Sequence, residues 1–175
     1  REVAIISTPR DLPQFKALLG NGSDWGMSFD YIVQPSPDGL AQAYILAEDF
    51  LGGAPSTMVL GDNVFFGEGL PDRLAAADQR SSGGTVFGYR VSDPERYGVV
   101  EFDKAGTVLS IVEKPEKPKS SYAVTGIYFL DGDAPRRARE IKPSPRGELE
   151  ITDLLNSYRQ EGALNVEKLG RGFAW

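Results

Sequence analysis

The stretch TMVLGDN, residues 57–63, is a short apolar run that ends in glycine, aspartate and asparagine. Such a run is typical of a strand buried in a parallel sheet. Residues 70–80 have the periodicity of a helix, and residues 85–89 predict another apolar strand. Asp62 therefore stands at the carboxyl end of a strand, where open α/β sheets bind their ligands.

The same alternation extends toward the N-terminus. Residues 3–6 predict a strand and residues 13–19 a helix. Residues 29–33 alternate as a strand does, the loop of residues 34–39 follows, and helical periodicity covers residues 40–50. Alternating strands and helices indicate a parallel sheet that is covered on both faces.

The second half of the chain changes character. Two strands flank a turn at residues 103–106, which indicates an inserted β-hairpin. The further elements predicted are strands at residues 99–102, 108–112, 122–130 and 164–169 and helices at residues 135–141 and 149–160. We therefore expect one α/β domain over residues 1–175, a Rossmann-like, mostly parallel sheet with helices on both faces and a hairpin inserted.

Composition limits the chemistry. With 25 acidic and 19 basic residues, the net charge of -6 argues against a nucleic acid or an anionic membrane as partner. No apolar run approaches the roughly 20 residues of a membrane span. The chain has neither cysteine nor histidine, which excludes thiolate nucleophiles, imidazole bases and Cys/His zinc sites and fits the cytoplasm. Catalysis would have to use carboxylates, lysine, arginine and the backbone.

The loop after residues 29–33 carries a candidate base-binding site. Gln34 offers one acceptor and two donors, so its carboxamide could pair with the N3–H and O4 of either thymine or uracil. Gly39 would let the backbone approach a ring closely. The alternative is a solvated glutamine and a glycine required only by the turn.

Four charged residues are candidates for phosphate or metal chemistry. Asp62 could be one oxygen ligand of Mg²⁺, or else the cap of the next turn. Glu113 could accept from two sugar hydroxyls and Lys114 could meet a phosphate, or the two could form a surface ion pair. Arg146 lies just before a helix, where backbone donors favour an anion, although an exposed loop arginine is the simpler interpretation.

Several blocks of sequence together resemble the glucose-1-phosphate thymidylyltransferases. The resemblance covers essentially the whole chain, in the family's order. The blocks are QPSPDGLAQA at residues 34–43, VLGDN at 59–63, DPERYGVV at 93–100, EKP at 113–115, GELEITD at 147–153 and GRGFAW at 170–175.

The resemblance implies an activity and roles for individual residues. Enzymes of this family condense dTTP with α-D-glucose 1-phosphate to give dTDP-glucose and pyrophosphate, with Mg²⁺, on the route to dTDP-rhamnose. The resemblance also implies a homotetramer. Asp62, Lys114 and Arg146 would be catalytic, with Asp62 also a metal ligand and the two cations on the sugar phosphate. The thymine loop would contain Gln34, Pro37 and Gly39, and the glucose would lie among Tyr97, Gly98, Glu113, Val124, Tyr128 and Trp175.

Such a reaction suits a chain without histidine. The sugar phosphate is already an anion at pH 7 and can attack the α-phosphorus in line without a general base. The protein must position two polyanions and neutralise the charge that develops between them.

Two features of the family are missing from the 175 residues. The G-x-G-T-R-L phosphate loop with its following lysine would precede residue 1, and a second metal-binding aspartate would follow Trp175. We therefore expect a chain truncated at both ends that is inactive by itself. The alternatives are a uridylyl-transferring UDP-sugar pyrophosphorylase and a non-catalytic domain that binds sugar nucleotides.

Overall fold

The main sheet of the computed structural model, which describes all 175 residues, is built around one long strand. This strand, β8 (Tyr122–Leu130), pairs antiparallel with β5 (Gly84–Arg90) along one edge. Its other edge pairs antiparallel with β3 (Ser56–Val59) and with β6 (Gly98–Phe102). The hairpin partner β7 (Val108–Glu113) extends the sheet beyond β6, and β9 (Leu164–Leu169) runs parallel to β5.

Helices cover both faces of this sheet. On one face α2 (Gln42–Leu46), α5 (Ala134–Glu140) and α6 (Ile151–Gln160) enclose the larger apolar core, in which Leu154 and Tyr158 are fully buried. On the opposite face α4 (Leu70–Asp78) packs its Ala77 with residues of β5, β8 and β9. Along β5, Val86 joins the first core and Phe87 the second, which is the period of two that a doubly covered strand requires.

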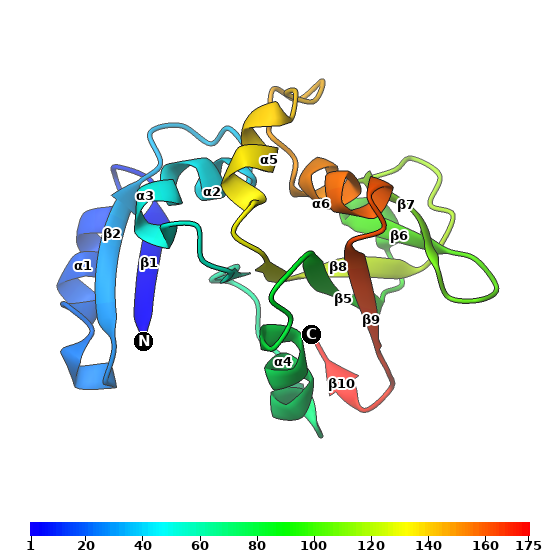
Figure 1. Cartoon of the computed structure of the whole chain (residues 1–175), viewed down its shortest axis with the longest axis horizontal. Coiled ribbons are helices and arrows are strands. Elements are labelled where there is room, and N and C mark those ends of the chain that lie inside the picture. The colour runs from blue at the N-terminus through cyan, green and yellow to red at the C-terminus, as the bar shows by residue number, and fades with distance from the viewer.

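A small separate sheet forms the N-terminal part. It consists of β1 (Glu2–Ser7) and β2 (Ser28–Val33), which pair in parallel around the connecting helix α1 (Leu12–Leu19) and a 3-10 turn, η1 (Ser23–Trp25). Figure 1 shows this unit beside the main sheet, with α2, α3 and α5 between them. No residue of β1 or β2 is buried.

The α/β class, the hairpin and the helices on both faces are confirmed, but the sheet is mixed rather than mostly parallel. Only β1–β2 and β5–β9 pair in parallel. The reason is β8, which lies between β3 and β5 and runs against both, so the two strands are parallel to each other without being paired.

Residues 40–50 form two short helices instead of the single helix expected. The chain breaks at Ala47, between α2 and α3 (Glu48–Leu51). The remaining elements are η2 (Pro94–Arg96) and two short strands, β4 (Phe66–Gly67) and β10 (Phe173–Ala174), which pair antiparallel. None of the helices is both long and apolar enough to cross a membrane.

Candidate active site

The first group of predicted residues lies where β3 ends against β8. Asp62 is exposed, and one oxygen of its carboxylate, Oδ1, accepts a hydrogen bond of 2.7 Å from the Asn63 amide. The Asn63 Oδ1 in turn accepts from the Gly126 backbone N–H at 3.1 Å and from the Trp175 indole N–H. Asn63 thus ties the candidate metal ligand to the C-terminal tryptophan.

Trp175 is held among aromatic rings. Its ring lies 5.3 Å from the centroid of Tyr97, 6.0 Å from that of Tyr89 and 6.5 Å from that of Phe65. The Tyr89 hydroxyl donates to the Phe173 carbonyl at 3.1 Å, which fixes the short segment that leads to Trp175. The expected juxtaposition of Trp175 with Tyr97 is present in the structure.

Gly126 leaves room on β8 for this arrangement. A Cβ atom at Gly126 would come within 2.7 Å of the Asn63 Cγ. Any side chain here would therefore push Asn63 away from Asp62 and Trp175. The strand carries a glycine at this point because the asparagine occupies the space.

The second group lies at the end of the β6–β7 hairpin. Glu113 closes β7 opposite Gly98, and a Cβ at Gly98 would lie 2.6 Å from the Thr152 Cγ2, 3.3 Å from Glu113 Oε2 and 3.9 Å from Val124. Gly98, Glu113 and Val124 are therefore neighbours, as the resemblance implies. Thr152 on α6 joins them.

Lys114 has an unusual backbone conformation. It is the one non-glycine residue with a positive φ, 40°, and its N–H donates to the Tyr97 carbonyl at 3.0 Å. A lysine in the left-handed region costs free energy that the surrounding structure must offset, and such residues are concentrated at functional sites. The hydrogen bond to Tyr97 couples this strained position to the aromatic group.

Both candidate phosphate cations approach the same oxygen. The Lys114 Nζ and the Arg146 Nη2 each lie 4.0 Å from Glu113 Oε1. Burial, with the charge of Glu150 adding to it, raises the pKa of Glu113, while the two cations act in the opposite direction. Glu113 thus faces two positive groups from a partly buried position.

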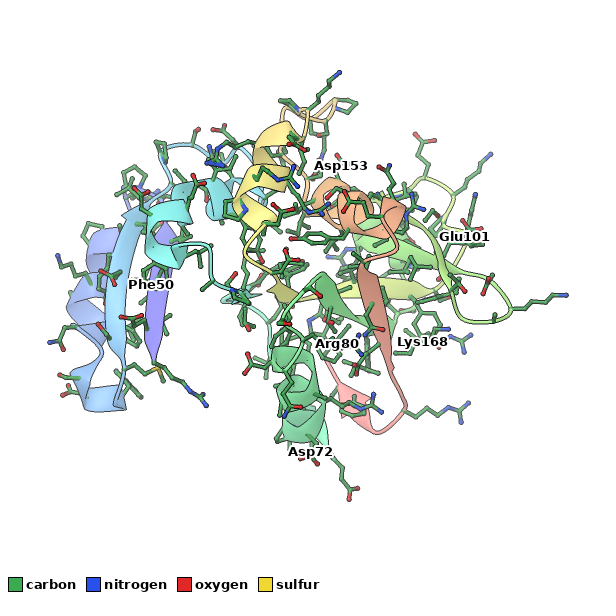
Figure 2. All side chains as sticks on the ribbon, in the orientation of Figure 1. Phe50, Asp72, Arg80, Glu101, Asp153 and Lys168 are labelled. Carbon is green, nitrogen blue, oxygen red and sulfur yellow. The ribbon has the colours of Figure 1, made fainter.

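Arg146 is surrounded by carboxylates. It hydrogen-bonds Glu150 through Nε at 3.1 Å and through Nη2 at 2.9 Å, and Glu148 through Nη2 at 3.0 Å. These bonds, led by the one to Glu150, raise the pKa of the guanidinium further. In Figure 2 the labelled Asp153 marks the first turn of α6, the helix that begins one residue after Glu150.

Tyr128 lies in the protein core, as Val124 on the same strand does. It is 3% exposed and belongs to the large apolar core. Burial raises its pKa, and the charge of Glu113 adds to the effect, so the hydroxyl stays protonated. Tyr128 thus lies near Glu113 while contributing chiefly to the core.

The loop after β2 is joined to the Arg146 segment. The Gln34 amide donates to the Gln42 Oε1 at 2.7 Å and to the Gly39 carbonyl at 3.3 Å, while Pro37 is exposed. Gly39 has φ 104°, and a Cβ there would lie 2.6 Å from the Leu149 nitrogen. Backbone hydrogen bonds from Leu149 to Asp38 at 2.6 Å and from Ala41 to Leu149 at 3.1 Å complete the link.

The predicted residues therefore form three linked groups, and some contributors were missed. Leu149 joins the base loop to Arg146, and Tyr97 joins Lys114 to Trp175. The residues that sequence reasoning did not select are Asn63, Phe65, Tyr89, Glu148, Glu150 and Thr152. Four of them, Asn63, Glu148, Glu150 and Thr152, lie inside the sequence blocks that carry the family resemblance, which was the only signal for them.

Asp62 is the candidate protein ligand for Mg²⁺. No group of three or more His, Cys, Asp or Glu side chains that could hold a metal ion occurs in the structure. Mg²⁺ is commonly held by one or two carboxylates together with substrate phosphates. Asp62 fits that role, since it is exposed and its Oδ2 takes part in no hydrogen bond.

Comparison with known proteins gives one consistent result. Residues 1–175 match the family model described as Nucleotidyl transferase. The chain is 61% identical over 175 residues to a glucose-1-phosphate thymidylyltransferase of Xanthomonas campestris pv. campestris (strain B100), and 54% identical to one of Neisseria gonorrhoeae. All of this chain is covered, but only 59% and 61% of those relatives, so it spans about three fifths of their length.

Solved structures agree in fold. A crystal structure described as a glucose-1-phosphate thymidylyltransferase from Bacillus anthracis, in complex with sucrose, matches with TM-score 0.85 and 40% identity over 97% of this chain and 68% of that one. A UDP-glucose pyrophosphorylase complexed with UDP-glucose matches with TM-score 0.79 and 24% identity over 97% and 73%. At 24% identity the second match shows a common fold alone.

Proposed function

The chain belongs to the nucleotidyl transferase family, and from this premise we propose that its protein transfers the thymidylyl group of dTTP to α-D-glucose 1-phosphate, giving dTDP-glucose and pyrophosphate. The identities of 61% and 54% to glucose-1-phosphate thymidylyltransferases support the choice of base and sugar. The observation that carries the proposal is the convergence of Lys114 and Arg146 on Glu113, beside Gly98 and Tyr97.

The sugar phosphate would bind on this convergence. Lys114 and Arg146 would contact its phosphate as a point charge and a planar fork, respectively. Glu113 would accept from hydroxyls of the sugar, and its buried position would make those hydrogen bonds strong. Trp175 and Tyr97 would bound the apolar side of the sugar and exclude water.

The reaction needs positioning more than proton transfer. An oxygen of the sugar phosphate attacks the α-phosphorus of dTTP, the bond from that phosphorus to the β-phosphate oxygen breaks, and pyrophosphate leaves with the electron pair. The nucleophile is already an anion, so the lack of histidine is no obstacle. Gln34 and the Gly39 backbone would orient the thymine, which sets the line of attack.

We further propose that Asp62 holds Mg²⁺ together with phosphate oxygens. When bound, the ion would neutralise charge that develops on the transferring phosphoryl group. Asn63 restricts the Asp62 carboxylate by donating to its Oδ1, which leaves Oδ2 for the metal.

The proposal also covers the assembly of the protein and its location in the cell. Following the resemblance, we propose a cytoplasmic homotetramer that supplies dTDP-glucose for dTDP-rhamnose synthesis. Light scattering on the full-length protein tests the assembly, and a monomer would contradict it.

The direct test is pyrophosphate release by the full-length protein with dTTP and glucose 1-phosphate, beside UTP as the competing nucleotide. We expect dTTP to be preferred. Release with UTP alone would assign the uridylyl reaction, and binding without release would assign a non-catalytic domain. The 175-residue chain assayed beside it tests the expectation that it has no turnover by itself.

A further inference from the structure

Arg146 makes unequal contacts with two carboxylates. Its Nε and Nη2 bind Glu150, and the same Nη2 also binds Glu148, whereas its Nη1 takes part in no hydrogen bond. Glu150 thus holds the guanidinium through two nitrogens, and it shares one of them, Nη2, with Glu148. An incoming phosphate would meet Nη1 and Nη2.

Glu150 is an internal support. Its side chain is only 7% exposed, and besides Arg146 it accepts a 2.7 Å hydrogen bond from the Ser144 hydroxyl. It lies directly before α6, so its backbone is fixed by the helix start. A buried carboxylate with three donor groups around it cannot leave without exposing an uncompensated charge.

Glu148 is in the opposite situation. Its side chain is 36% exposed, and its carboxylate has Arg146 as its only hydrogen-bond donor. An exposed ion pair of this kind contributes about 0–1 kcal/mol, because water solvates both charges once they separate. A phosphate dianion that offers several acceptor oxygens can therefore replace Glu148 on Nη2.

Resting on the proposed function, we propose that Glu150 is a positioning residue that aims Arg146 at the sugar phosphate, and that Glu148 is a displaceable carboxylate that competes with this phosphate for the same guanidinium. The two glutamates thus act on one arginine with opposite sign. Glu148 keeps the cation paired while the sugar phosphate is absent, and Glu150 stays in place when it arrives.

The test compares Glu148→Gln and Glu150→Gln in the full-length protein. Removing the competitor in Glu148→Gln should lower KM for glucose 1-phosphate about two- to fivefold with kcat unchanged. This is the change in binding that corresponds to the free energy of a solvent-accessible ion pair. Removing the support in Glu150→Gln should raise the same KM about tenfold. KM for dTTP should change in neither variant, and calorimetric titration of glucose 1-phosphate should follow the KM values.

Asp153→Asn is the matched control. Asp153 lies on the first turn of α6, where Figure 2 labels it, and is exposed. The hydrogen bonds of the Arg146 side chain go to Glu148 and Glu150 and none goes to Asp153. The substitution Asp153→Asn removes one negative charge close to Arg146. It therefore separates competition for Arg146 from a general change in the electrostatic potential of the site. We expect its KM for glucose 1-phosphate to change by less than about twofold.

The outcomes distinguish this inference from the proposed function. An unchanged or raised KM in Glu148→Gln, or a fall equal to that in Asp153→Asn, overturns the competition. Because the Glu148 side chain is partly exposed and makes a single hydrogen bond, this result stands even if Glu150→Gln fails to fold. Absence of turnover in the wild-type protein with dTTP and glucose 1-phosphate would instead reject the proposed function.

Discussion

The residues proposed to bind the sugar phosphate and the loop proposed to bind the base are supported by the fold in different ways. Glu113, Gly98 and Val124 stand on strands of the main sheet, over a core that includes fully buried leucines. The loop with Gln34 and Gly39 follows a two-stranded sheet in which no residue is buried. The first region is positioned by its own packing, and the second depends on its contact with Leu149.

The two regions should differ most in how much a substitution lowers the free energy of unfolding. Leu154→Ala empties a fully buried site between α6 and the sheet, so we expect a loss of about 2–5 kcal/mol in the free energy of unfolding. Ile5→Ala on the partly exposed β1 should cost about 1 kcal/mol or less. Denaturant unfolding measures both, and equal losses would show that the N-terminal unit packs as tightly as the main body.

The next prediction concerns catalysis and Asp62, which lies in the turn after β3. Asp62→Asn keeps the shape but removes the charge that would hold Mg²⁺, so turnover should fall about 10²-fold, roughly 2.7 kcal/mol. The thermal midpoint should stay nearly constant, since asparagine caps turns as well as aspartate does. Wild-type turnover at saturating Mg²⁺ would make Asp62 structural and remove it from the metal site.

A smaller effect is expected where the base loop meets Leu149. A Cβ in Gly39→Ala would press on the Leu149 backbone at a φ that alanine rarely adopts, so the loop should shift and KM for dTTP should rise about tenfold. KM for glucose 1-phosphate should rise less.

Gly52→Ala is the control for backbone strain alone, because Gly52 also has a positive φ, 55°, with nothing within 4 Å of its Cβ position. We expect this variant to leave KM for dTTP unchanged. If both variants raise it equally, the contact with Leu149 is not what positions the loop.

Local sequence pattern predicted most of the helices and strands but not how the strands pair. The apolar run at residues 57–60 correctly predicted a strand, β3, but not its surroundings. Its residues alternate between partly buried and exposed, Val59 is 55% exposed, and the strand pairs antiparallel with β8 instead of lying inside a parallel sheet. That β8 lies between β3 and β5 depends on contacts some 70 residues apart, which no periodicity records. The single helix expected over residues 40–50 is interrupted at Ala47, although the helical periodicity of these residues is continuous and no local sequence signal marks the interruption.

The site shows the same limit. Asp62, Lys114 and Arg146 were selected because charged residues at the ends of strands and before helices have a chemical meaning of their own. Asn63 and Glu150 act through partners. The Asn63 side chain meets Gly126 and Trp175, which lie 63 and 112 residues away in sequence, so its role is visible only after folding.

The smallest effect expected concerns the pH dependence of the sugar side. Burial first, and the nearby Glu150 second, raise the pKa of Glu113 above the ordinary glutamate value of 4.5. Between the unfolded pKa and this raised folded value, the native state binds more protons than the unfolded state. The contribution of Glu113 to stability therefore falls as pH rises through that window and is unfavourable at neutral pH.

Glu113→Gln removes this contribution while keeping the shape of the side chain. We expect the stability difference, variant minus wild type, to be more positive at pH 7 than at pH 4, which lies below the pKa of Glu113 in both states. Thermal unfolding of the two proteins at both pH values measures it. A difference that is more negative at pH 7 would mean that Lys114 and Arg146 outweigh burial, so that the pKa of Glu113 is lowered and the carboxylate is held mainly by its two cations.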